Sequence, residues 1–159
     1  MPELQLRAMT ETEFERWRLV IARAYADEQI RCGNWAPEEA LDLGLAGNAE
    51  LLPQGLATDD MLLLTAEQPD GTAVGRVWLG LNHPRATPDC AFLYDIEVEE
   101  PYRGQGYGRA LLAAAEDAAR SHGIAGLELN VFGDNTPAIA LYRSAGYIVV
   151  QQQMRTTLT

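Results

Sequence analysis

The stretch EEPYRGQGYGRALLAAAEDAARSHG, residues 99–123, decides the fold. Gly104, Gly106 and Gly108 stand on alternate positions before an Ala- and Leu-rich run that predicts a helix ending at Gly123. Because glycine costs a helix about 1 kcal/mol relative to alanine, these three glycines require an explanation. Two interpretations are open: a loop whose backbone N–H groups bind an anion at the helix N-terminus, or a turn that packs tightly on its neighbours.

The residues of this stretch exclude two common phosphate-binding motifs. The chain contains no lysine, so a GxxxxGK[ST] loop is absent. Arg109 occupies the position of the third glycine in a GxGxxG dinucleotide motif. Arg103 and Arg109 flank the glycines, which favours an anionic ligand over a plain turn.

Strands and helices surround this stretch in an order that predicts the fold class. Alternating or apolar runs predict strands, and the TETE capping box at Thr10–Glu13, among other start signals, predicts helices. The expected strands are Leu4–Met9, Met61–Glu67, Ala73–Leu81, Cys90–Val98, Gly126–Phe132 and, in the tail, Tyr147–Leu158. The expected helices run from Thr10 to about Cys32, from Pro37 to before Pro53, from Gly106 to His122, and from an N-cap at Asn135 or Thr136 to Ser144. We therefore expect one α/β (α+β) domain over residues 1–159, with a mixed, mostly antiparallel sheet of six to seven strands and four helices in the order βααβββαβαβ(β).

Composition and charge limit the classes of function. The net charge of −11 argues against nucleic-acid binding, and no apolar run approaches the length of a membrane span. The two cysteines form no CxxC pair and the two histidines lack ligand spacing, so we expect no metal site. The N-terminus lacks an apolar signal core, which predicts a cytoplasmic protein. The 19 acidic residues and seven arginines of residues 1–100 contrast with four acidic residues and five arginines in residues 101–159. An anion would be tolerated in the second part, and a cation would be attracted to the first.

Two motifs together resemble one enzyme family. Arg103, Gly106 and Gly108 form the pattern R-x-x-G-x-G after the strand YDIEV. The block LELNVFGDNTPAIALYRSAGY, residues 127–147, fits the pattern N-x-x-A-x-x-L-Y-x-x-x-G-[FY] at Asn135, Ala138, Leu141, Tyr142, Gly146 and Tyr147. In this order and at this spacing, the segments 90–123 and 126–147 resemble the GNAT superfamily of acyl-CoA-dependent N-acetyltransferases.

The resemblance implies a site for acetyl-CoA. In the family the first motif holds the pyrophosphate on backbone amides, and the preceding strand binds the pantetheine arm through its backbone. The residues implied to bind the cofactor are Ile96, Val98, Arg103, Gly104, Gln105, Gly106, Tyr107, Gly108, Arg109, Asn135 and Ala138. Two positions depart from the family pattern. Glu100 stands where many members have proline, and Asn130 stands where members that acetylate protein N-termini often have glutamate.

Acyl transfer to an amine needs a base for the ammonium proton and an acid for the departing thiolate. By its position in the second motif Tyr142 is the implied acid, with a core aromatic as the alternative. On the strand, Asp95, Glu97 and Glu99 are expected on one face, and Tyr94, Ile96 and Val98 on the other. Glu97 is our first choice of base, Asp95 the second and Tyr94 the third. Alternatively, these acids hold an ammonium group or pair with a buried arginine such as Arg76.

The resemblance and the charge distribution predict transfer of an acetyl group from acetyl-CoA to a small cationic amine or a basic peptide. Trp17, Tyr25 and Trp35 are either part of the acceptor cleft or ordinary packing residues. Two alternatives remain: a non-catalytic acyl-CoA-binding or sensor module, and an N-acyltransferase that uses another short acyl-CoA. Homodimers are common among similar proteins, and a homodimer is a further expectation.

Overall fold

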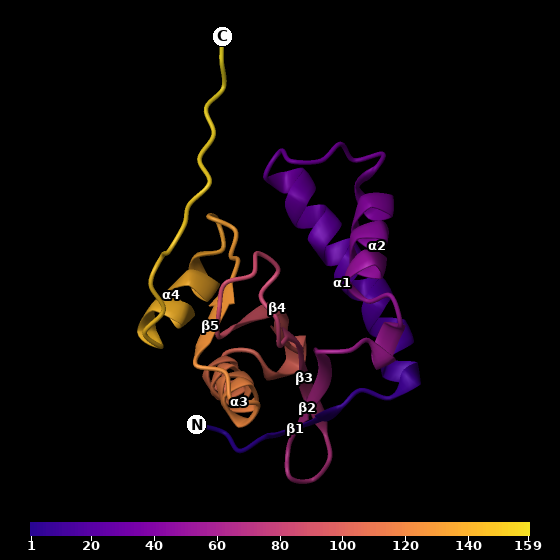
Figure 1. Ribbon diagram of the computed structural model, residues 1–159, viewed down its shortest axis with the longest axis vertical. Coiled ribbons are helices and arrows are strands. Elements are labelled where there is room, and N and C mark those ends of the chain that lie inside the picture. The colour runs from indigo at the N-terminus through magenta and orange to yellow at the C-terminus, as the bar shows by residue number, and fades with distance from the viewer.

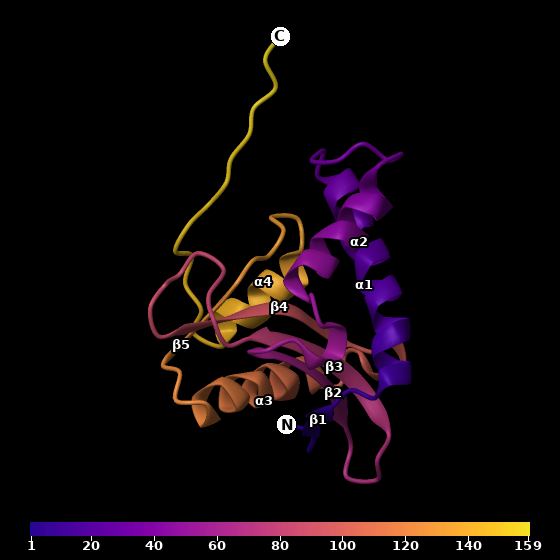
Figure 2. The same cartoon turned by 45° about the vertical axis from the view of Figure 1, so that its right-hand side comes forward.

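A computed structural model describes residues 1–159 as one sheet with helices on both sides (Figures 1 and 2). The strands are β1 (Gln5–Ala8), β2 (Met61–Glu67), β3 (Ala73–Gly80), β4 (Cys90–Val98) and β5 (Gly126–Leu129). The helices are α1 (Glu11–Arg31), α2 (Ala40–Leu51), α3 (Tyr107–Ser121) and α4 (Thr136–Ser144), with short 3-10 turns at Gly55–Ala57 and Glu100–Tyr102. The order of strands and helices expected from the sequence is confirmed from β1 to α4.

Local signals place the helix ends correctly in most cases. The Thr10 hydroxyl accepts a hydrogen bond from the Glu13 N–H at 3.1 Å, and the Glu13 carboxylate accepts one from the Thr10 N–H at 2.9 Å, which completes the capping box. Asn135 caps α4. Helix α2 begins at Ala40 rather than Pro37, because residues 37–39 form a turn. None of the helices is long and apolar enough to cross a membrane.

The sheet has the order β1-β2-β3-β4-β5. The first four strands are antiparallel neighbours, and β5 joins β4 in parallel. The parallel ladder begins at Cys90 opposite Gly126 and ends at Leu93 opposite Leu129. Beyond Leu93, strand β4 pairs only with β3, so its other edge is open from Tyr94 to Val98.

A bulge divides β4 at the end of this ladder. Leu79 of β3 pairs with Leu93 and Trp78 pairs with Asp95, so Tyr94 is an extra residue on β4. Its ring stacks on Trp78 with centroids 4.6 Å apart. The prediction that Tyr94 shares a face with Ile96 and Val98 was therefore wrong. The extra residue changes the alternation, so that Tyr94 and Asp95 both lie on the side of α1.

Two hydrophobic cores lie on opposite faces of the sheet. The α3-side core contains Ala66, Val74, Val77, Leu79, Ala91, Leu93, Tyr107, Leu111, Leu112, Ala115 and Ala119. The α1-side core contains Met9, Phe14, Trp17, Ile21, Leu52, Leu63 and Trp78. Burial on both faces fixes the positions of α1 and α3 relative to β4, which lies between them.

The expected strand over Tyr147–Leu158 is absent, so the sheet has five strands instead of six or seven. After Gly146, whose φ of +96° lies in the left-handed region, the chain extends away from the sheet (Figures 1 and 2). A segment with strand propensity becomes a strand only when its backbone reaches a free sheet edge, and this segment does not. The strand expected to end at Phe132 also ends earlier, at Leu129.

Candidate active site

The glycine loop, residues 103–108, leads into the N-terminus of α3, which no side chain caps. Gly104 and Gly106 have φ values of +74° and +89°, a left-handed conformation that favours glycine. Gly106 is the N-cap of α3, and the first helical hydrogen bond runs from the Ala110 N–H to the Gly106 carbonyl at 3.3 Å. The N–H groups of the first three helical residues, 107–109, therefore have no helical acceptor, as expected of an anion site.

The third glycine has a different role. Gly108 lies within α3, and a Cβ atom there would lie 3.4 Å from Leu141 Cδ2 of α4. At Gly106 a Cβ would lie 3.2 Å from Pro2 Cδ. Gly104 and Gly106 therefore shape the open loop, whereas Gly108 lies in the first turn of α3 with space for a methyl group in contact with Leu141.

The side chains of the predicted cofactor-binding arginines bind other parts of the protein. Arg103 donates to the Val98 carbonyl at 3.0 Å and to Glu97 Oε1 at 2.6 Å. Arg109 donates to Ser144 Oγ at 2.6 Å. Both guanidinium groups form exposed hydrogen bonds, so a phosphate that entered the loop could exchange for these partners.

The remaining predicted cofactor residues line the loop or support it. Gln105 donates to the Pro101 carbonyl at 3.1 Å, within the loop. The Tyr107 side chain is buried, and its hydroxyl accepts a hydrogen bond from Gln68 at 2.7 Å, so only its backbone faces the loop. Ile96 and Val98 pack their side chains on the α3-side core, which leaves their backbone at the open edge of β4.

Asn135 and Ala138 lie at the first turn of α4. The Asn135 side-chain oxygen accepts from the Ala138 N–H at 3.3 Å, so this pair of motif residues builds the helix start.

Asp95 is a paired carboxylate with two donors. Its Oδ2 atom accepts from Arg76 Nε at 2.8 Å and from Trp17 Nε1 at 3.1 Å, and its side chain is 13% exposed. For Asp95, the structure therefore shows the alternative interpretation, in which a strand acid pairs with Arg76. The two donors hold this carboxylate in place and restrict access to it. Trp17 is a core residue, and its indole also positions this acid.

Glu97 lies opposite Arg76 in the strand register, but its ion pair is with Arg103, and its side chain is 38% exposed. Of the two strand acids named as candidate bases, Glu97 is the more accessible.

Tyr142 of α4 retains its proton. Burial, together with the charges of Asp95 and Glu97, raises the pKa of its hydroxyl to about 12. The charges of both strand acids therefore act on the Tyr142 hydroxyl. A phenol that stays protonated at neutral pH is suited to act as a proton donor.

Sequence reasoning did not identify Glu28 of α1, on which the charges of the same two acids act. Tyr25 lies 6.1 Å from Phe132 between ring centroids, and Arg31 donates to Asp134 at 2.7 Å, so this face of α1 is turned toward the β5–α4 loop. Glu28 lies between them at spacing i, i+3, i+6. Burial raises the pKa of its carboxyl; Arg31 opposes this effect, and the carboxylates of Glu97, Asp134 and Asp95 add to it.

The aromatic residues predicted for the acceptor cleft divide into two groups. Trp17 is buried in the α1-side core. Tyr25 is 43% exposed and touches Trp35 at 5.5 Å between centroids, on the same face of α1 as Glu28. One acidic group, Glu28, and the aromatic pair Tyr25 and Trp35 thus lie on the side of α1 that faces the β5–α4 loop.

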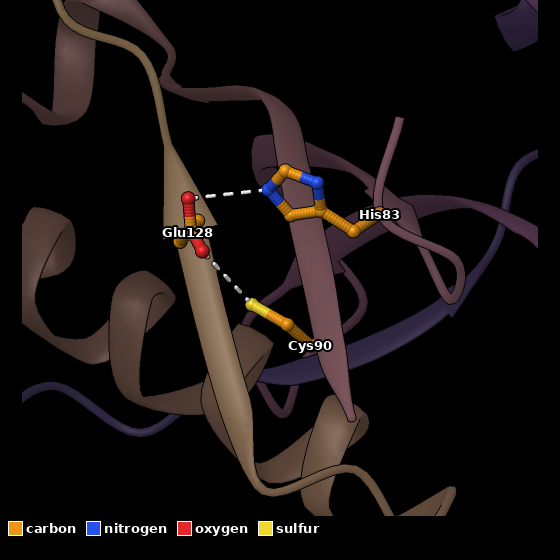
Figure 3. Close-up of side chains that lie close together, drawn as sticks. All are labelled: His83, Cys90 and Glu128. Atoms are coloured by element: carbon orange, nitrogen blue, oxygen red, sulfur yellow. Dashed lines mark hydrogen bonds and ion pairs between the residues drawn. The ribbon is translucent and has the colours of Figure 1, made fainter. Parts of the chain in front are cut away.

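A second cluster lies at the other end of β4, where His83, Cys90 and Glu128 meet (Figure 3). His83 Nε2 lies 3.1 Å from Glu128 Oε1, and the Cys90 thiol donates to Glu128 Oε2 at 3.5 Å. His83 Nδ1 accepts from the Arg85 N–H at 3.0 Å, so the proton of a neutral ring sits on Nε2 and points at Glu128. Burial raises the pKa of the Cys90 thiol to about 11. This cluster is a closed hydrogen-bond network beside an open pocket of about 460 Å³.

Comparisons with known proteins agree with this geometry. The model of the acetyltransferase (GNAT) family matches residues 18–147. The chain is 37% identical over 144 residues to the uncharacterized N-acetyltransferase YycN of Bacillus subtilis (strain 168), covering 91% of this chain and 92% of YycN. It is 30% identical over 155 residues to the uncharacterized N-acetyltransferase YdgE of the same organism, covering 96% and 97% of the two chains.

Solved structures extend the comparison to three dimensions. A crystal structure of YycN superposes with a TM-score of 0.93 at 35% identity, covering 99% of both chains. The PaiA N-acetyltransferase of Thermoplasma acidophilum, solved in complex with coenzyme A, shares the fold, with a TM-score of 0.66 at 21% identity and 95% and 93% coverage. The chain belongs to the acetyltransferase (GNAT) family and is a GNAT N-acetyltransferase. Members of this family use acetyl-CoA.

Proposed function

We propose that this chain transfers the acetyl group of acetyl-CoA to a primary amine on a small cationic acceptor or a basic peptide, by direct attack and without a covalent enzyme intermediate. One observation carries the proposal. The open edge of β4 leads from the bulge at Tyr94 toward the uncapped, glycine-rich start of α3. An extended amide-bearing arm and a diphosphate can therefore bind one after the other along these two elements.

The edge of β4 beyond Leu93 suits the pantetheine arm. Backbone N–H and C=O groups on this edge have no strand partner, and an extended ligand with amide groups can pair with them as an added strand does. The diphosphate then reaches the N–H groups of residues 104–109, where the helix dipole and the missing glycine side chains favour an anion. Arg103 and Arg109 flank the same loop and add positive charge.

The proton chemistry is assigned to Tyr142 and Glu97. The amine nitrogen attacks the thioester carbonyl carbon, the C–S bond breaks, and the Tyr142 hydroxyl donates its proton to the departing sulfur. The nitrogen then loses its second proton to give the amide, and this proton restores the Tyr142 hydroxyl. Glu97 takes the ammonium proton before attack, directly or through a water molecule, since Asp95 is fixed by Arg76 and Trp17. Asp95 is proposed to position Arg76 and the α1 helix instead of acting as the base.

The acceptor is proposed to bind between α1 and the β5–α4 loop. Glu28 has no hydrogen-bonded counter-ion there, whereas the carboxylates of Asp95, Glu97 and Asp134 are paired with Arg76, Arg103 and Arg31. A carboxylate without a partner attracts a cation and disfavours an anionic acceptor. Tyr25 and Trp35 add aromatic faces over which an ammonium group can bind.

An acetylation assay tests this proposal. The full chain is incubated with acetyl-CoA and a panel of a diamine, a polyamine, an arginine-rich peptide, a neutral peptide and an anionic amino acid. Thiol release and product mass are recorded. We expect turnover with the cationic amines, falling as salt concentration rises because the attraction is screened. Turnover confined to neutral or anionic acceptors would overturn the acceptor class.

A further inference from the structure

The end of α4 places a second tyrosine against Tyr142. The Gly146 N–H donates to the Arg143 carbonyl and the Tyr147 N–H donates to the Tyr142 carbonyl, both at 3.0 Å. With Gly146 in the left-handed region, these two hydrogen bonds form a Schellman motif. The motif brings the third-last helical residue into contact with the second residue beyond the cap. The rings of Tyr142 and Tyr147 accordingly lie 5.8 Å apart between centroids.

Tyr147 is in turn anchored to α3. Its hydroxyl donates to Glu116 Oε1 at 3.1 Å, and Glu116 lies in the middle of that helix. Burial, together with the charge of Glu116, raises the pKa of the Tyr147 hydroxyl, so this group keeps its proton and remains a donor. A hydrogen bond to a carboxylate is roughly twice as strong as one between neutral groups. The end of α4 is therefore fixed to α3 through one side-chain pair.

The second side-chain hydrogen bond between the two helices is available for exchange. Arg109 of α3 donates to Ser144 of α4 at 2.6 Å, and the guanidinium group is exposed. A phosphate bound at the glycine loop can take over this donor. The bond between Tyr147 and Glu116 lies away from the loop and does not compete with a phosphate, so it ties the helices together in the loaded protein as well.

The alignment of α4 on α3 matters for the reaction because the two helices hold different reactants. In the proposed function, α3 binds the diphosphate and β4 binds the pantetheine arm, so these elements set the position of the thioester sulfur. The acid, Tyr142, lies on α4, and its hydroxyl forms no hydrogen bond with another protein group, so packing alone positions it. A displacement of about 1 Å between reacting groups can lower a rate roughly 100-fold.

We propose that Tyr147 and Glu116 are positioning residues for acetyl transfer, which hold the Tyr142 ring on α3 so that its hydroxyl meets the thioester sulfur. This inference rests on the proposed function, because it assigns the pair a part in the same reaction. Neither residue touches the reacting atoms. The sequence motif accepts phenylalanine or tyrosine at position 147, so it predicts the ring only; the hydroxyl and its carboxylate partner on α3 are features of this chain.

Steady-state kinetics of the full chain with acetyl-CoA and the diamine putrescine test the proposal. We expect Tyr147→Phe to lower kcat about tenfold and to leave KM for acetyl-CoA within about threefold, because the ring and the diphosphate site remain. In a Tyr142→Phe chain, the same change should lower kcat by less than about twofold, since no acid is left to position. A bond that only stabilises the fold would act equally in both backgrounds.

Variants of Glu116 supply a rescue and a matched control. Glu116→Gln retains an oxygen that accepts from Tyr147 and should keep kcat within about threefold, whereas Glu116→Ala should lower kcat about tenfold, like Tyr147→Phe. Asp117→Ala removes the neighbouring carboxylate of α3, which pairs with Arg120 on the surface, and should leave kcat unchanged. All variants should retain the circular dichroism spectrum of the wild-type chain.

NMR of chains labelled with carbon-13 at the tyrosine Cζ atom tests the positioning without any acceptor. The Tyr142 signal is identified by its loss in Tyr142→Phe. We expect coenzyme A to shift this signal in the wild-type chain, because the thiol then lies beside the hydroxyl. Tyr147→Phe should abolish the shift, although coenzyme A still binds.

The outcomes separate this inference from the proposed function. Wild-type kcat in Tyr147→Phe or Glu116→Ala, an equal loss of kcat from Tyr147→Phe in both backgrounds, or an unchanged NMR shift would overturn the positioning role and leave the proposed function standing. Wild-type kcat in Tyr142→Phe would remove the acid itself. Absence of turnover with every cationic amine of the acceptor panel would overturn the proposed function, and the positioning role with it.

Discussion

The two halves of strand β4 differ although they belong to one continuous strand. Cys90–Leu93 pairs on both sides, with β3 and with β5, and Ala91 and Leu93 lie in the α3-side core. Tyr94–Val98 pairs on one side only and carries Asp95 and Glu97, the two acids whose charges raise the pKa of Tyr142. The single extra residue at Tyr94 separates them. The comparison teaches that one bulge turns a core strand into a strand with an open, polar edge, without any change of strand order.

Deletion of Tyr94 should remove the difference in strand pairing between the two halves of β4, and it has the largest expected effect. Without the extra residue, Ile96 and Val98 still face α3 and Asp95 and Glu97 still face α1, but the β4–β5 ladder can continue past Leu93. We expect acetyl-CoA binding to weaken by at least about 100-fold, or about 2.7 kcal/mol, in calorimetric titration.

Tyr94→Ala is the matched control, since it also removes the ring from Trp78 but retains the bulge. Both variants should lose about 3 kcal/mol of unfolding free energy. Equal acetyl-CoA affinity in the two variants would show that the bulge does not open the site.

Leu93→Ala probes the paired half of β4. Its side chain is 3% exposed in the α3-side core, so truncation leaves a cavity and should cost about 2–4 kcal/mol in urea unfolding. The affinity for acetyl-CoA at a temperature where the variant is folded should change by less than about threefold, which is under 1 kcal/mol. A large loss of affinity in a folded protein would mean that the two halves are not separate in function.

Tyr142→Phe tests the proposed proton donor. We expect kcat to fall by about 100-fold while KM for acetyl-CoA stays within a few-fold, because a general acid acts in the transition state. Since the pKa of Tyr142 is raised to about 12, deprotonation of this hydroxyl should not limit the wild-type rate anywhere between pH 6 and pH 9, the range of the measurement. Unchanged kcat in steady-state assays would assign Tyr142 to packing.

Glu28→Gln has the smallest expected effect and tests the acceptor side. Loss of one carboxylate from the acidic group should raise KM for a cationic amine by about tenfold, or 1.4 kcal/mol, with little change in KM for acetyl-CoA.

The same variant should be at least as stable as wild type at pH 7. The folded-state pKa of Glu28 is raised above the unfolded value, so the charged form destabilises the fold once pH exceeds the unfolded pKa. Thermal unfolding as a function of pH checks the sign. A lower Tm for Glu28→Gln at pH 7 would mean that Glu28 stabilises the fold through a partner.

Sequence reasoning succeeded where the signal is local. The capping box at Thr10, the N-cap at Asn135 and the two motifs around Gly106 and Tyr142 depend on neighbours within a few residues. It failed where a second element decides the outcome. The face of Tyr94 depends on how β3 pairs with β4, and the role of Glu28 depends on the approach of α1 to the β5–α4 loop.

The tail and the strand acids show the same limit. The composition of the tail predicted a strand over Tyr147–Leu158, but strand formation needs a partner edge that composition does not specify. The pair between Arg76 and Asp95 was one of the open alternatives, and only the packing of α1 against the sheet shows that Trp17 completes it.

Calorimetric titration with acetyl-CoA of the wild-type chain, Gly104→Asp and Gly123→Asp tests the central claim most directly. The two glycines have φ values of +74° and +77°, and no atom lies within 4 Å of a Cβ built at either, but they lie at opposite ends of α3. We predict saturable binding by wild type and Gly123→Asp, and affinity at least about tenfold lower for Gly104→Asp, because a carboxylate beside the uncapped N-terminus repels the diphosphate. Equal loss in both variants, or no binding by the wild-type chain, would contradict the assignment of the glycine loop.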